Sequence, residues 1–111
     1  MTTPGSDHVA VTRDGDHATA RLSGEFDMSA TFTVEPALER ALAEPGVHVL
    51  TVDLSGLSFI DSTGIGILLR LESDAKARGT KLTVVPAPPE VQRVFEVAGV
   101  ADALPFTKPA A

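Results

Sequence analysis

The sequence contains no cysteine, tryptophan or tyrosine, and its five phenylalanines are its only aromatic residues. The absence of cysteine excludes disulfide bonds, thiolate metal sites and cysteine nucleophiles, and it is compatible with a reducing cytosol. The scarcity of aromatic rings gives little support to a cofactor held by stacking, and it leaves the core to valine, leucine, isoleucine and alanine. We therefore expect neither a metal site nor a cofactor.

Positive charge and long apolar runs are also scarce. Nine Lys and Arg residues stand against fifteen Asp and Glu residues, a formal net charge of -6, and no basic run is present. Such a chain repels a nucleic-acid backbone, so we expect no direct nucleic-acid binding. The uncharged apolar stretches that flank Asp61, residues 54–60 and 62–69, are far shorter than the roughly 20 residues that span a bilayer. The first residues lack the features of a secretion signal, so we expect a soluble, cytoplasmic protein without membrane insertion.

The length and composition fit one domain. A chain of 111 residues with 43% hydrophobic and 22% charged residues can bury about two thirds of its unfolded surface in one core. No internal repeat or linker interrupts it. We expect a domain over residues 8–106, between a flexible N-terminus at 1–7 and a C-terminal tail at 107–111.

Four segments have the pattern of β-strands. Apolar and polar residues alternate over 8–12 and 17–23, and Asp14-Gly15 between them predicts an antiparallel hairpin. The segment 47–54 is too continuously apolar for a strand that is wet on one face, and it suits a central strand with parallel neighbours. Residues 81–85 predict a further short strand.

The first helix is indicated by a stripe of apolar residues at helical spacing, namely Val34, Ala37, Leu38, Ala41 and Leu42. Proline is tolerated in the first turn of a helix but breaks its interior. Because Pro36 lies near the front of the stripe, we predict a start near Thr33 in preference to Ser29, and an end at Pro45-Gly46.

Two more helices are predicted over residues 63–78 and 90–97, with Gly79 and Gly99 as their stop signals. One further short turn or strand should follow within residues 100–106. The order β β α β α β α predicts an α/β fold: an open mixed sheet of four to five strands with crossover helices.

The run "SFIDSTGIGILLRL", residues 58–71, places three polar residues in the most apolar part of the chain. The expected position is the mouth of a crossover helix at the C-terminal edge of the sheet, where α/β proteins meet ligands and partners. One interpretation is that Asp61 or Ser62 caps the helix, which stabilises it by about 1 kcal/mol. Capping does not explain Gly64 and Gly66, each of which costs a helix about 1 kcal/mol relative to alanine. Their small size indicates a docking surface.

Three segments resemble the STAS domain of the anti-sigma factor antagonist family. They are "VDLSGLSFIDSTGIGILL", the earlier "GEFD" and the later "PEVQRVFEVAGVADAL". The similarity covers roughly residues 8–106, in the same order and with similar spacing, and Asp-Ser-Thr-Gly is its most specific part. It implies a STAS-like fold.

The resemblance also implies a phosphorylation switch. Ser62, directly after the aspartate, corresponds to the serine that a partner kinase phosphorylates, and that kinase is also the anti-sigma factor; Thr63 is a less favoured acceptor. Unphosphorylated, the chain would bind the anti-sigma factor and free a sigma factor, and a PP2C-like serine phosphatase would reset the cycle. The chain itself would catalyse nothing, because ATP belongs to the kinase. The expected partner-binding residues are Asp27, Asp61, Ser62, Thr63, Gly64 and Ile65.

Other classes fit the residues less well. A hydrolase would use Ser62 as nucleophile, but Ile60 stands where G-x-S-x-G needs its first glycine. None of the three histidines, His8, His17 and His48, is placed as its base. A nucleotide-binding G-x-G-x-x-G fails because Leu69 replaces its third glycine. The open alternative is a STAS module that serves as a signalling scaffold or as a subunit of a transport complex.

Overall fold

A computed structural model of the chain describes residues 8–107. It contains one four-stranded sheet in the order β1-β2-β3-β4. The strands are β1 (Val9–Asp14), β2 (His17–Phe26), β3 (Val49–Ile60) and β4 (Lys81–Val85). Strand β1 is antiparallel to β2, whereas β2, β3 and β4 run parallel. The expected hairpin and the parallel neighbours of the central strand are confirmed.

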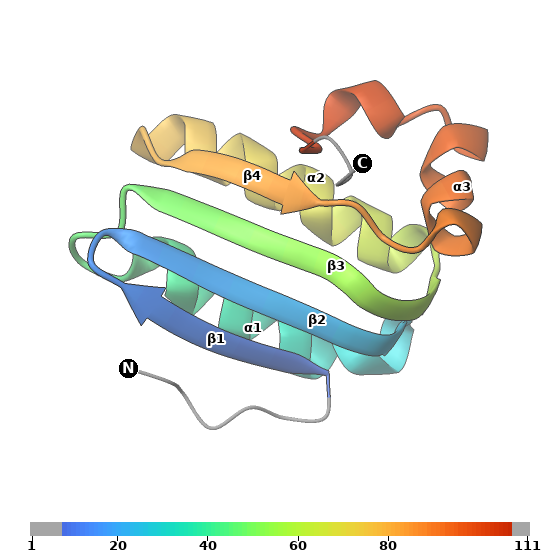
Figure 1. Cartoon of the computed structure of the whole chain (residues 1–111), viewed down its shortest axis with the longest axis horizontal. Coiled ribbons are helices and arrows are strands. Elements are labelled where there is room, and N and C mark those ends of the chain that lie inside the picture. The colour runs from blue at the N-terminus through green and yellow to red at the C-terminus, as the bar shows by residue number, and fades with distance from the viewer. Residues whose placement is uncertain (1–7, 108–111) are drawn as a thin grey trace.

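Three α-helices complete the domain: α1 (Met28–Ala43), α2 (Ser62–Arg78) and α3 (Pro89–Val97). Helices α1 and α2 cover the same face of the sheet, and α3 lies beyond the end of β4 (Figure 1). A short 3-10 turn, Ala101–Ala103, follows α3, and Phe106 then forms a parallel bridge with Val84. The fold class and the element order are as predicted. Within residues 8–107, no helix is long and apolar enough to cross a membrane.

The core lies between the sheet and the α1–α2 layer. Alternate residues of the two middle strands are buried there: Ala18, Ala20 and Leu22 of β2, and Leu50, Val52 and Leu54 of β3. Phe95 of α3 is fully buried and meets Phe106 edge to face at a centroid distance of 5.2 Å. Aliphatic residues thus supply most of the packing, and a single aromatic pair closes the C-terminal side.

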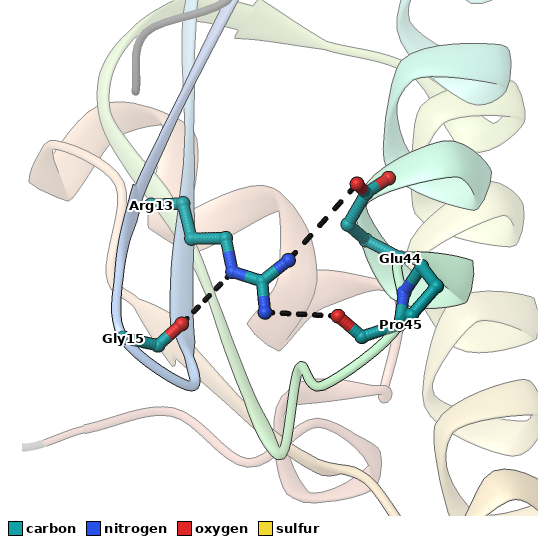
Figure 2. Close-up of polar contacts among 4 residues, drawn as sticks. All are labelled: Arg13, Gly15, Glu44 and Pro45. Carbon is teal, nitrogen blue, oxygen red and sulfur yellow. Dashed lines mark hydrogen bonds and ion pairs between the residues drawn. The ribbon is translucent and has the colours of Figure 1, made fainter.

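Arg13 ties the hairpin to the loop after α1 (Figure 2). Its Nε donates a hydrogen bond to the carbonyl of Gly15 at 2.8 Å, and its Nη2 donates to the carbonyl of Pro45 at 2.9 Å. Its Nη1 also lies 4.0 Å from a carboxylate oxygen of Glu44. The guanidinium therefore holds together two loops at the end of the sheet where β2 and β3 begin, opposite the end where α1 and α2 start.

The predicted start of the first helix is wrong. Helix α1 begins at Met28 and contains Pro36 in its interior. Two features of the structure outweigh the unfavourable effect of the proline on the helix: Asp27 caps the helix, and Ala30 and Val34 are buried. Pro36 removes one backbone donor, but it lies on the exposed side of α1, where water can satisfy the carbonyl that loses its partner.

The predicted end of the central strand is also wrong. The segment 55–60, expected as a turn, continues β3 and pairs with the last residues of β2 as far as Phe26 and Ile60. Its burial does not alternate, because register shifts interrupt the pairing after Arg21 and after Gly24. Because burial is irregular here, apolar and polar residues do not alternate in the sequence. Together with Ser55-Gly56, this gives the segment the sequence pattern of a turn.

Candidate functional site

The candidate site lies where two parallel strands end side by side. Phe26 of β2 and Ile60 of β3 are paired residues, and each is followed by one aspartate and then by a helix. The backbone N–H of Asp61 donates to the carbonyl of Phe26 at 3.4 Å. Asp27 and Asp61 thus stand next to each other at the C-terminal edge of the sheet, and both helices start from this end (Figure 1).

Both aspartates are helix caps with the same geometry. Oδ1 of Asp27 accepts a hydrogen bond from the backbone N–H of Ala30, and Oδ1 of Asp61 accepts one from Gly64, each at 3.0 Å. Each bond satisfies one of the unpaired donors of a helix N-terminus. Of the two capping residues that the sequence left open, the structure selects Asp61, so the hydroxyl of Ser62 is not needed to begin α2.

Asp27 is additionally held by Ser29. The backbone donor of Ala30 and then the hydroxyl of Ser29, which donates to Oδ1 at 2.8 Å, lower the pKa of the Asp27 carboxyl below its ordinary value of 3.8. Hydrogen bonds to a carboxylate favour its charged form, so Asp27 carries its negative charge at neutral pH. The hydroxyl of Ser29 is engaged by this bond.

Ser62 differs from Ser29 in being available. It is the first residue of α2, its side chain is exposed, and within residues 8–107 its hydroxyl has no hydrogen-bond partner. Thr63, the adjacent hydroxyl, is half-buried. Of the three hydroxyl groups close behind the two caps, those of Ser29, Ser62 and Thr63, the Ser62 hydroxyl is therefore the most accessible to another molecule.

The two glycines after Thr63 have different surroundings. A Cβ on Gly64 would lie 2.8 Å from the carbonyl oxygen of Phe26 and 3.0 Å from a side-chain carbon of Ile60, so this glycine is required by the packing of α2 onto the strand ends. Ile65 is buried as well, at 6% exposure. Gly64 and Ile65 are therefore both buried within the domain. A Cβ on Gly66 would meet no atom within 4 Å.

Two residues at this end of the molecule were not predicted from the sequence. Met28 and Phe32, in the first two turns of α1, are 65% and 81% exposed, which is unusual for large apolar side chains. They went unnoticed because the helix was predicted to start after them. The signal that could have revealed them is their spacing of four residues from each other, directly after Asp27.

Two of the three histidines lie away from Ser62, whereas His8 lies beside Ser23 and Gly24 near the end of β2. His17 begins β2 and His48 directly precedes β3, at the opposite end of the sheet, and the Nε2 atom of His17 is hydrogen-bonded to Thr51 at 2.7 Å. Within the described part of the chain, no three His, Asp or Glu side chains are grouped as metal ligands. The fold and the site together define a small α/β module that presents a serine at the start of a crossover helix.

The family of this module follows from comparison with known proteins. A family model described as "Mlab, STAS domain" matches residues 9–106, nearly the whole chain. The anti-sigma-B factor antagonist of Listeria monocytogenes is 32% identical over 90 residues, which are 81% of this chain and 78% of the relative. The chain therefore belongs to the STAS-domain family, with the anti-sigma factor antagonists.

Solved structures agree with this assignment. The crystal structure of an anti-sigma factor antagonist from Mycobacterium paratuberculosis has a TM-score of 0.79 and 25% identity, over 96% of this chain and 89% of that chain. The Bacillus anti-sigma factor antagonist SpoIIAA gives TM-scores of 0.73 in its unphosphorylated form and 0.67 in its phosphorylated form. Its two structures cover 90% of this chain, and 88% and 91% of their own, at 22% and 21% identity, so they support the fold alone.

Proposed function

We propose that this protein is a phosphorylation-controlled anti-sigma factor antagonist. In its unphosphorylated form it binds an anti-sigma factor that is also a serine kinase, and this binding releases a sigma factor. Phosphorylation of Ser62 ends the binding, and a PP2C-like serine phosphatase restores it. The single observation that carries the proposal is the Ser62 hydroxyl: it is exposed at the first position of α2 and has no hydrogen-bond partner within residues 8–107.

The isolated domain is suited to carry the phosphate. Asp61 supplies the cap, so modifying Ser62 removes no hydrogen bond within the described chain. An anion near a helix N-terminus is stabilised by typically about 0.3–1 kcal/mol. The phosphate adds about -1.5 to -2 charges, and the nearby carboxylates of Asp27 and Asp61 oppose part of that gain. We therefore expect the phosphorylated chain to fold with nearly unchanged stability.

A complex with a partner should tolerate the phosphate on Ser62 far less well than the isolated domain does. If a partner covers Ser62, a phosphate there must either lose its hydration or displace the partner, and burying an unpaired charge is strongly unfavourable. A penalty of about 5.5 kcal/mol lowers affinity about ten-thousandfold, which is sufficient for an on/off switch. The residues proposed to face the partner are Asp27, Asp61, Ser62 and Thr63. Gly64 and Ile65 contribute by holding the start of α2 in place.

The role of the chain is regulatory binding, and the chemistry belongs to its partner. The kinase supplies ATP and its own catalytic groups. The Ser62 oxygen accepts the γ-phosphoryl group as its bond to the β-phosphate breaks, ADP leaves, and the serine proton passes to the kinase. Asp61 fixes the backbone that carries this hydroxyl, because its side chain accepts a hydrogen bond from the N–H of Gly64, three residues further on. We therefore propose Ser62 as the modified residue and Asp61 as a positioning residue.

The test uses purified anti-sigma factor kinases from the same genome, with ATP and the full chain. We expect phosphate on Ser62 by mass spectrometry, none on Ser62→Ala, constitutive binding by Ser62→Ala and weak binding by Ser62→Asp. Ser73→Ala, which alters an exposed serine further along α2, is the matched control and should behave as wild type. A chain that no kinase modifies or binds would contradict the proposal and favour a scaffold or transport-complex subunit.

A further inference from the structure

Exposed apolar side chains lie on α1, whose first turn stands at the same end of the sheet as Ser62 at the start of α2. Four large hydrophobic residues are exposed within residues 8–107, and two of them, Met28 at 65% and Phe32 at 81%, lie one turn apart on α1. Residues four apart lie above one another on a helix, so the two side chains form one continuous strip. Contiguous exposed apolar surface of this kind marks an interaction site.

A second row runs along α2 from the candidate phosphorylation site. Ser62, Gly66 and Arg70 are each four residues apart and therefore share one side of the helix. Arg70 at the far end of this row pairs with Glu35, which follows Phe32 by three residues on α1; Nη1 and Oε2 are 3.1 Å apart. The ion pair shows that the two rows flank the junction between the helices, so the strip on α1 and the row on α2 border one surface.

Gly66 is the residue on this surface that the fold itself does not explain. Gly64 is required by the nearby Phe26 carbonyl, but a Cβ on Gly66 would meet no atom within 4 Å. A glycine inside a helix costs about 1 kcal/mol relative to alanine, and nothing within the described residues returns that free energy. Bare backbone one turn from Ser62 lets another protein approach α2 closely.

We propose that Met28, Phe32 and Gly66 form the seat on which the anti-sigma factor rests. This inference depends on the proposed function, and it adds where the binding free energy comes from. Phe32 and Met28 would be the apolar anchors, and a helix or loop of the partner would lie against Gly66. The anti-sigma factor is the occupant that the observations favour because Gly66 lies one turn from Ser62, the residue that this partner must reach, and Met28 begins the neighbouring helix at the same end of the sheet.

The charges around the seat indicate which charges a partner should carry around its own contact surface. Asp27 and Asp61 border it at one end and Glu35 and Glu39 at the other, and Arg70 pairs with Glu35. Glu39 is exposed and has no ion-pair partner within residues 8–107. A complementary partner has an apolar centre and a basic rim, as protein interfaces commonly do. A phosphate on Ser62 would lie beside the apolar centre, where its desolvation opposes binding.

The seat also explains how one phosphate can have a large effect. Ser62 and Gly66 are neighbouring positions on one side of α2, so the phosphate would project beside the point of closest approach. A partner that must move away to accommodate it loses contact with Met28 and Phe32 as well. The penalty for modification then includes the lost apolar contacts in addition to desolvation.

The experiment measures the affinity of the unphosphorylated chain for the purified anti-sigma factor kinase by calorimetry. We expect Phe32→Ala and Met28→Ala each to weaken binding at least tenfold. The matched control is Val97→Ala, which truncates an equally exposed residue, 82%, at the end of α3 and should leave affinity unchanged. Raising the salt concentration should slow association with wild type, and Glu39→Lys should do the same at constant salt.

Gly66→Ala gives the most discriminating result. Within the free chain it should raise the unfolding temperature by a few degrees, because alanine favours the helix and nothing obstructs its methyl group. Binding should nevertheless weaken about tenfold or more, whereas Ser73→Ala on the same helix should not weaken it. A residue with a purely structural role would not combine higher stability with lower affinity.

The outcomes separate this inference from the proposed function. If the kinase binds wild type but binds the variants at Met28, Phe32 and Gly66 equally well, the seat is wrong and the phosphorylation switch stands. If no candidate kinase binds the wild-type chain, both are wrong. Self-association of the free chain that Phe32→Ala abolishes, measured by sedimentation, would assign the surface to a second copy and overturn the seat for the anti-sigma factor.

Discussion

The two glycines of α2 provide a sharp test of the packing at the site. In Gly64→Ala the new methyl group would lie 2.8 Å from the carbonyl oxygen of Phe26, and 3.0 and 3.1 Å from side-chain carbons of Ile60 and Phe26. The closest contact is backbone at the end of a paired strand, which cannot rotate away as a side chain can. Overpacking of this kind costs about 1–3 kcal/mol, and the helix propensity of alanine returns less than about 1 kcal/mol. We expect a net loss of about 1–2 kcal/mol.

Gly66→Ala has the opposite sign. No atom lies within 4 Å of its new methyl group, so only the propensity gain of about 0.5–1 kcal/mol remains. The two variants should therefore differ by about 2 kcal/mol, or about 8 °C in unfolding temperature for a domain of this size. Urea and thermal unfolding followed by circular dichroism at neutral pH measure both values. Equal stabilities, or a destabilised Gly66→Ala, would refute the packing described for the start of α2.

Three further expectations concern the caps and the hairpin. Asp61→Ala should lower the free energy of unfolding by about 0.5–2 kcal/mol, whereas Ser62→Ala should change it by less than about 0.5 kcal/mol; urea unfolding would contradict the capping assignment if the two were equal. Because the pKa of Asp27 is lowered in the folded chain, its contribution is present above the unfolded value of 3.8 and lost as pH falls through the folded value. As the pH falls through this acid range, the unfolding free energy of wild type should therefore decrease relative to that of Asp27→Asn. Parallel curves of unfolding free energy against pH for the two proteins would contradict the lowered pKa of Asp27. Arg13→Lys should lower the free energy of unfolding by about 1 kcal/mol, because one ammonium group cannot reproduce the two hydrogen bonds of the guanidinium group. An unchanged free energy of unfolding would contradict the role of Arg13 in joining the two loops.

The fold was largely predictable because its signals are local. Asp14-Gly15 between alternating runs predicted the hairpin, and Gly15 has the positive φ of 61° that such a turn requires. Gly79 ends α2 with a φ of 72°, and the N–H groups of Gly79 and Thr80 close the last turn. In each case a few neighbouring residues determine the backbone, so the sequence pattern is sufficient.

The boundaries that failed depend on contacts distant in sequence. Pro36 is unfavourable locally, but the cap at Asp27 and the burial of Val34 keep the helix continuous around it. The last part of β3 is a strand because Phe26 and Ile60 pair, which the pattern around Gly56 does not reveal. Tertiary packing decides both cases.

Only part of the candidate site could be read from the sequence. The sequence placed Ser62 at the start of the helix but left the cap open between Asp61 and Ser62, and the family resemblance indicated Ser62 as the modified residue and Asp27 as a partner contact. That Asp27 and Asp61 are neighbours depends on the register of two parallel strands. Met28 and Phe32 remained hidden because the helix was predicted to start after them, and because exposure is a property of the folded chain.

The central claim is that the free domain accepts a dianion on one surface oxygen while a docked partner does not. The most direct measurement takes the chain phosphorylated stoichiometrically by its kinase and compares it with the unmodified chain, in both unfolding free energy and affinity for the anti-sigma factor. We expect unfolding free energies within about 1 kcal/mol of each other and an affinity reduced by about a thousandfold or more. Equal affinities, or a phosphorylated chain that no longer folds, would contradict it.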